Sequence, residues 1–157
     1  MSIEDDISFF ERVPTLGSLG RQALRILAIG AETRYIHGGE VLFNAGEEAD
    51  GAFVVQEGRF ALSSDTSTDG AALTVGPGTL LGEVALFTET RRPTTAMALE
   101  PSTVLRIPRP LFIKMLDSFP DAATKLREIF AARLDQSARE IANVRAILEV
   151  HERKGKE

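Results

Sequence analysis

The sequence contains no cysteine, which excludes disulfide bonds and thiolate metal sites. That absence is compatible with a reducing compartment such as the cytoplasm. The first residues, MSIEDDISFFERV, carry acids where a signal peptide has a basic region and an apolar run. No stretch approaches the roughly 20 apolar residues of a membrane-spanning helix. We therefore expect a soluble, cytoplasmic protein with no membrane partner.

An excess of basic residues is also missing. The net charge is −5, from 18 Lys and Arg against 23 Asp and Glu. From Asp121 onward the two signs nearly balance, eight against seven, so the acidic excess lies in the first 120 residues. A protein that binds duplex DNA usually carries a basic patch that releases counterions. No such patch exists at the scale of the domain, and we expect no direct DNA binding.

Groups that perform catalysis are scarce as well. The two histidines, His37 and His151, lie far apart in the chain and have no clustered carboxylates beside them. No serine stands in a G-x-S-x-G setting, and no phosphate-binding P-loop pattern occurs. We therefore expect no catalytic centre and no bound metal, and we expect that the protein is not an enzyme.

Between Thr33 and Pro108 the chain alternates apolar and polar residues in short runs broken by glycines. Such runs predict short antiparallel strands. Phe53, Val55, Phe60 and Leu62 would face one side of a hairpin turning at Glu57-Gly58. We predict a mainly β fold with flanking helices, a double-stranded β-helix of the jelly-roll or cupin-like β-roll type.

Helical spacing marks both ends of the chain. Residues 5–29 predict helices interrupted near Pro14, and residues 109–118 predict another that ends at Phe119-Pro120. From Pro120 the sequence predicts a long helix, because no glycine or further proline occurs before Gly155. We divide the chain into residues 1–120, the roll with its helices, and residues 121–157, a long C-terminal helix and tail.

One face of that long helix repeats at alternating spacings of four and three. Its members are Phe130, Leu134, Ser137, Ile141, Val144 and Leu148. This spacing is typical of a coiled-coil seam and indicates a homodimer through the C-terminal helix. The alternative is a single helix face packed on the roll.

The stretch GEVALFTETRRPTTA, residues 82–96, interrupts the strands. Val84 to Phe87 can form one helical turn, whose first N–H groups suit an anion. Gly82 before the turn allows close approach of a ligand, and Arg92 can return to grip two phosphate oxygens. Glu83 would repel a phosphate but can accept hydrogen bonds from sugar hydroxyls. The set indicates a sugar–phosphate ligand; the alternative is an ion pair between Glu83 and Arg92.

The same stretch closely resembles the phosphate-binding cassette of cyclic nucleotide-binding domains, F-G-E-x-A-L-(spacer)-R-x-A. These domains occur in catabolite-activator-type regulators and in regulatory subunits of protein kinase A. The family's earlier glycine and acid positions are matched by Gly39-Glu40, Gly46-Glu47 and the segment Val55 to Gly58. The resemblance covers nearly the whole chain and implies a non-enzymatic receptor for cAMP or cGMP that signals by repositioning its C-terminal helices.

The resemblance assigns roles to single residues. Arg92 corresponds to the arginine that pairs with the cyclic phosphate, and Glu83, beside Gly82, to the acceptor of the ribose 2′-hydroxyl. Ala85 matches the position whose backbone N–H contacts the phosphate, in the turn that begins at Val84. Ser137 falls near the hydroxyl that contacts the base in the bacterial regulators, where the same helix forms the dimer.

Pro93 departs from the family pattern because proline has no N–H to offer the phosphate. The contact would then be missing or shared with Thr94 or Thr95, so a ligand-free interaction module with the same fold stays open as the alternative. The seven residues after Val150 are too few for a recognition helix, so we expect the signal to pass to another, unknown protein.

Overall fold

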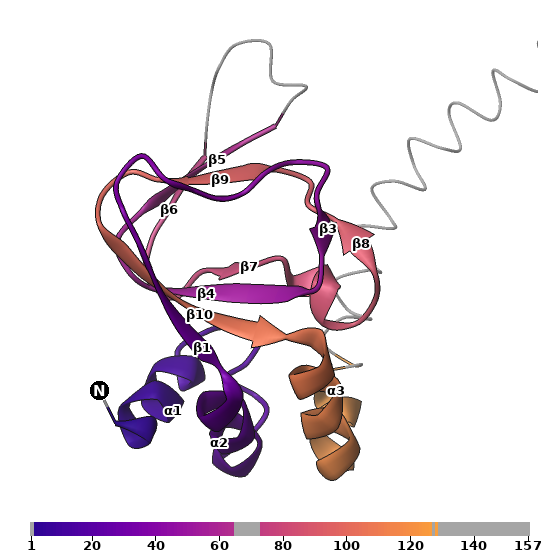
Figure 1. The fold of residues 1–157 in the computed structure, drawn as a ribbon. Helices are drawn as coiled ribbons and strands as arrows, with labels where there is room; N and C mark the ends of the chain where they lie inside the picture. Colours follow the sequence, from indigo (N-terminus) through magenta and orange to yellow (C-terminus); the bar gives the residue numbers. More distant parts are fainter. Residues whose placement is uncertain (1, 65–72, 127, 129–157) are drawn as a thin grey trace, which may run out of the picture.

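A computed structural model describes residues 2–64, 73–126 and 128 of the chain. Two four-stranded antiparallel sheets face each other and form a roll (Figure 1). In order, the first sheet contains β1 (Glu32–Ile36), β10 (Ser102–Pro108), β4 (Gly51–Glu57) and β7 (Leu80–Leu81). The second contains β2 (Val41–Phe43), β9 (Thr95–Ala98), β5 (Phe60–Ser63) and β6 (Leu73–Val75). A short pair, β3 (Glu48–Ala49) and β8 (Thr90–Arg91), lies at one end, and the predicted β-roll is confirmed.

Three helices cover the outer face of the first sheet (Figure 1). They are α1 (Ile3–Glu11), α2 (Arg21–Gly30) and α3 (Arg109–Ser118), and residues 120–126 are helical as well. Ser2 begins α1 with a capping box, in which its hydroxyl accepts from the N–H of Asp5. Tight turns occupy residues 12–19, so the predicted interruption near Pro14 is confirmed.

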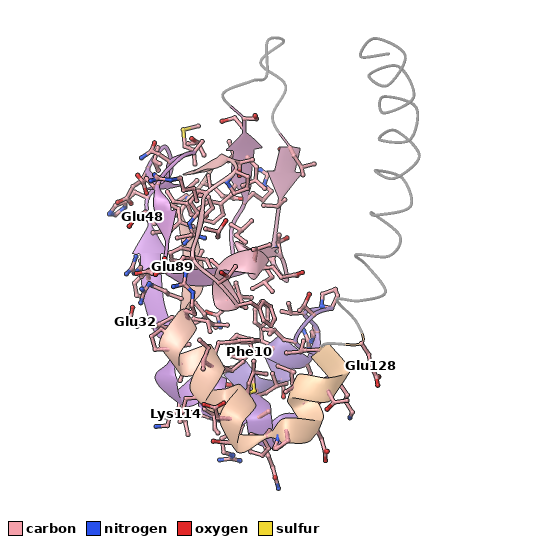
Figure 2. All side chains as sticks on the ribbon, turned by 90° about the vertical axis from the view of Figure 1, so that its right-hand side faces the viewer. Phe10, Glu32, Glu48, Glu89, Lys114 and Glu128 are labelled. Carbon is pink, nitrogen blue, oxygen red and sulfur yellow. The ribbon has the colours of Figure 1, made fainter. Side chains whose placement is uncertain are left out.

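The core has two parts because β4 is buried on both faces. Phe53 and Val55 point into the roll, whereas Ala52 and Val54 point toward the helices. The roll interior is completed by Ile36, Phe43, Phe60, Leu81, Ala96, Ala98 and Val104. Figure 2 shows Phe10, which is fully buried, where the helices meet the roll. The first sheet is therefore held between two apolar layers, and its position fixes the loops at its ends.

The hairpin predicted at Glu57-Gly58 is wrong. β4 pairs with β10 and β7, while β5 pairs with β6 and β9, so the chain crosses from one sheet to the other at this turn. The four apolar side chains assigned to one side nevertheless share the roll interior. Alternation reveals which face of a strand is buried, but it does not reveal the strand's partner.

Of the long helix expected from residue 121 onward, the structure describes only residues 121–126 and 128, and these are helical. Residues 129–157, with Ser137 and the proposed dimer seam, lie outside the described residues. Within the described part of the chain, no helix is long and apolar enough to cross a membrane.

Replacing Phe60 by alanine tests the interior of the roll. The ring is fully buried, so we expect the free energy of unfolding to fall by about 3–5 kcal/mol. Leu73 on the neighbouring strand β6 is 67% exposed, and Leu73→Ala is the matched control, with an expected change below about 0.5 kcal/mol. Urea denaturation measures the free energy of unfolding of both variants. Equal decreases would contradict the assignment of Phe60 to the roll interior and of Leu73 to the surface.

Candidate functional site

A pocket of about 530 Å³ opens beside the short helix η1 (Glu83–Leu86). Its walls come from β3, β7, η1 and β8 and from the residues that join them. Of the predicted site residues, the pocket gathers Gly82, Glu83, Val84, Ala85 and Arg92. Thr94 and Thr95 are not among the residues that line it, and Ser137 lies outside the described residues. One continuous stretch of sequence thus supplies most of one cavity.

Gly82 allows the chain to turn from β7 into η1. Its backbone is left-handed, with φ 83° and ψ 36°, a conformation that other L-residues rarely adopt. A Cβ atom added here would lie 2.1 Å from Nη1 of Arg92. The predicted turn is a 3-10 helix, in which the N–H of Ala85 donates to the carbonyl of Gly82 at 3.0 Å. A glycine is therefore required both by the backbone and by the arginine that packs against it.

Arg92 is the most unusual side chain of the site. It is only 5% exposed, it forms no salt bridge with any described residue, and its Nη1 has no hydrogen-bond partner. Burying a charged group without a partner is costly. A guanidinium in this state favours an anion that enters the pocket and completes its hydrogen bonds.

Two aromatic rings and two acids partly offset that cost. Cζ of Arg92 lies 4.5 Å from the ring centroid of Phe43 and 5.4 Å from that of Phe53, within the range of cation–π attraction. Burial lowers the pKa of Arg92, and the negative charges of Asp50 and Glu47 oppose this shift. None of these contacts occupies the hydrogen-bonding edge of the guanidinium at Nη1.

The backbone of Arg92 is fixed from both sides. Its N–H donates to the carbonyl of Glu47, and its carbonyl accepts from the N–H of Gly46, each at 2.8 Å. The side chain therefore projects into the roll from a rigid position. The neighbouring Arg91 is exposed and donates through Nη1 to the carbonyl of Gly46 at 2.8 Å. The two adjacent arginines thus have different environments.

The ion pair considered between Glu83 and Arg92 is not formed. Instead, the hydroxyl of Thr15 donates to Oε2 of Glu83 at 2.7 Å. Thr15 is 3% exposed and belongs to the turns between α1 and α2. Sequence reasoning missed this contact, because nothing local connects residues that are 68 positions apart.

Arg109 was also missed. Its Nε donates to the carbonyl of Ala85 at 2.8 Å, and its Nη2 donates to the carbonyl of Ala49 at 2.5 Å. The first residue of α3 thereby ties together the short helix and β3. Phe87, directly after η1, packs edge-on against Phe112 of α3 at 5.3 Å between ring centroids. The pocket turn and α3 are therefore joined by one polar and one apolar contact.

Thr95 and Pro93 follow Arg92 in the chain and have different surroundings. Oγ1 of Thr95 accepts from the N–H of Ala45 at 2.9 Å, so this hydroxyl anchors the loop after β2. Pro93 is exposed and lines the pocket. Among the described residues, no group of three or more His, Cys, Asp or Glu could hold a metal ion.

A second pocket, of about 560 Å³, lies along β3 and β8. Two arginines reach it, but so do the carboxylates of Glu48, Asp50 and Glu89. Figure 2 shows Glu48 and Glu89 on the same side of the molecule. The greater number of acids makes this pocket a poorer anion site than the one above the buried Arg92.

Known proteins share this architecture. Residues 33–119 match the family model of the cyclic nucleotide-binding domain. A cyclic nucleotide-binding-like protein from Brucella abortus is 36% identical, with a TM-score of 0.65 over 72% of this chain and 98% of that one. The N-terminal domain of a transcriptional regulator from Streptomyces coelicolor is 29% identical, with a TM-score of 0.76 over 85% and 94%.

Among curated proteins, a lysophospholipase NTE1 from Pyricularia oryzae is 31% identical over 101 residues, which is 63% of this chain. The match spans only 7% of the length of that enzyme. The likeness therefore concerns one small part of a much longer protein. The family model matches more than half of the chain and includes the pocket turn and Arg92, so the chain belongs to the cyclic nucleotide-binding domain family.

Proposed function

We propose that this protein is a receptor for a cyclic nucleotide, cAMP or cGMP, and that it is a regulatory domain rather than an enzyme. The observation that carries the proposal is the buried guanidinium of Arg92, whose Nη1 has no partner. The family is generally regulatory, and the described residues hold no metal-binding cluster that would add chemistry.

The cyclic phosphate carries one negative charge and would pair with Arg92. A guanidinium presents two parallel N–H groups, which match two phosphate oxygens. Because Gly82 has no side chain, Nη1 of Arg92 packs directly against its backbone, which places the guanidinium beside the turn that would contact the phosphate. Pro93 supplies no N–H, and the N–H of Ala85 already donates to the carbonyl of Gly82, so a phosphate would have to share that donor. The hydroxyls of Thr94 or Thr95 would be further donors only if they turned toward the pocket, which they do not line here.

The ribose would bind beside the phosphate through Glu83. An ionised carboxylate only accepts hydrogen bonds, so it suits a 2′-hydroxyl and not the phosphate. This carboxylate accepts from the hydroxyl of Thr15, and Glu83 also lines the pocket. The arrangement separates the tasks, since Arg92 neutralises charge and Glu83 recognises a neutral donor.

The signal would leave the pocket through α3. Arg109 and the pair of Phe87 and Phe112 join the turn to this helix. A ligand that shifts the turn would then bias α3 and the helix that follows Pro120, by as much as it prefers one arrangement over the other. A lid that includes Ser137, a homodimer and an unknown downstream protein belong to the same proposal.

An interaction module without a ligand is the competing function, and Pro93 is the residue that favours it. Against it stands the energetic cost of Arg92. A domain that binds no anion would gain stability by exposing or replacing a buried, unpaired charge. Here the charge is held in place by backbone bonds on both sides.

Removing the guanidinium tests the proposed function. Wild-type protein, freed of nucleotide by unfolding and refolding, should bind cAMP or cGMP in titration calorimetry. Arg92→Ala should raise the Kd by about tenfold to a hundredfold, because one charge-assisted contact is lost. Arg59→Ala is the control, since Arg59 is exposed and bonds to Glu100 away from the pocket. Absence of heat from either nucleotide with the wild-type protein would contradict the proposal.

Gly82→Ala tests the close approach of the turn to Arg92. The new Cβ strains a left-handed backbone and displaces Nη1, so both stability and affinity should fall. Gly78→Ala is the matched control, because Gly78 has φ of +90° and nothing within 4 Å of the added atom. Both variants should lose roughly 1–2 kcal/mol of unfolding free energy in urea, and only Gly82→Ala should lose affinity. Equal affinities in the two variants would refute the geometric role of Gly82.

A further inference from the structure

Thr15 lies outside the stretch that forms the pocket, yet it contacts a pocket residue. Its hydroxyl donates to Oε2 of Glu83 at 2.7 Å, while Thr15 itself does not line the cavity. We propose that Thr15 is a positioning residue, which orients Glu83 toward the ribose 2′-hydroxyl. This inference rests on the proposed function and names a determinant of its ribose recognition.

The segment around Thr15 is rigid enough for this role. Val13 and Leu16, on either side, are fully buried in the helical layer of the core. The N–H groups of Leu16 and Gly17 both donate to the carbonyl of Val13, at 3.0 and 2.7 Å. Thr15 is 3% exposed within this tight turn. The hydroxyl is therefore presented from a fixed point.

A fixed donor orders the side chain that it contacts. Glutamate has several rotatable bonds and loses rotamer freedom when a ligand immobilises it. The hydrogen bond from Thr15 restricts that freedom before the ligand arrives, and it is of the strong, charge-assisted kind. A carboxylate has about four acceptor positions on its two oxygens, so it can accept from Thr15 and from a ribose hydroxyl together. Thr15 and the ribose would then share one carboxylate.

The same bond couples the N-terminal segment to ligand binding. If the hydrogen bond from Thr15 to Glu83 improves the affinity for a ribose, binding of that ribose must strengthen this hydrogen bond by the same factor. Residues 12–19 would thereby sense the sugar, although they do not touch the pocket. This coupling is separate from the one through Arg109 and α3.

Two substitutions at Thr15 and two nucleotides test the inference by calorimetry. Thr15→Val keeps the shape but removes the hydroxyl, and it should raise the Kd for the cyclic ribonucleotide about fivefold to tenfold. The Kd for its 2′-deoxy analogue should stay near the wild-type value, because that ligand does not use Glu83. Thr15→Ser restores a donor and should restore the affinity. Thr33→Val, at an exposed threonine on β1, is the control.

The outcomes distinguish a positioning role of Thr15 from a purely structural one. Loss of affinity for the ribonucleotide alone, with rescue by serine, supports a positioning role. Equal weakening for both nucleotides would indicate a purely structural role and would overturn the inference, as would an unchanged or tighter affinity for the ribonucleotide. Failure of the wild-type protein to bind either nucleotide would refute the proposed function itself, and the inference with it.

Discussion

The burial of a positive charge without a partner is the constraint on which the site depends. Arg92 is enclosed by the roll, and its side chain lies against the rings of Phe43 and Phe53. Phe53 belongs to β4 and Phe43 to β2, so one aromatic ring from each sheet lies against the same guanidinium. The backbone bonds to Gly46 and Glu47 prevent the residue from turning outward. The fold thus keeps the guanidinium away from water, which would otherwise hydrate its charge. An anion is the simplest group that would pair with this charge and accept a hydrogen bond from Nη1.

The turn opposite Arg92 is held by contacts from several parts of the chain. Gly82 begins it with a left-handed backbone, Arg109 holds the carbonyl of Ala85, and Thr15 holds the carboxylate of Glu83. Arg109 belongs to α3 and Thr15 to the turns between α1 and α2, so two different segments on the outer face of the first sheet support the turn. A turn of four residues has little stability of its own, so its conformation depends on these supports. Under the proposed function, the same dependence would let a change at the turn reach the helices.

Sequence reasoning could predict the roll and the local part of the site, since both are recorded in short-range patterns. Alternation revealed the buried faces of the strands, and residues 82–92 form one continuous stretch whose chemistry can be read directly. The sheet partners of β4 and β5 could not be read, because alternation is the same whichever strand lies alongside. Thr15, Arg109 and the two rings beneath Arg92 were missed for a related reason. Their roles arise from contacts between residues 24 to 68 positions apart, for which no local pattern exists.

Pro93 departs from the family pattern, and its position determines what that departure costs. Its ring is exposed at the edge of the pocket, and the hydrogen bonds that fix this part of the chain belong to the N–H and carbonyl of Arg92. The missing N–H therefore removes no bond from the fold. Under the proposed function, any loss would fall on the bound nucleotide, because one donor fewer would weaken binding without moving the guanidinium. Proline also fixes its own φ, which limits the motion of the chain directly after Arg92. The residue is thus compatible with a receptor of moderate affinity whose charge remains in place.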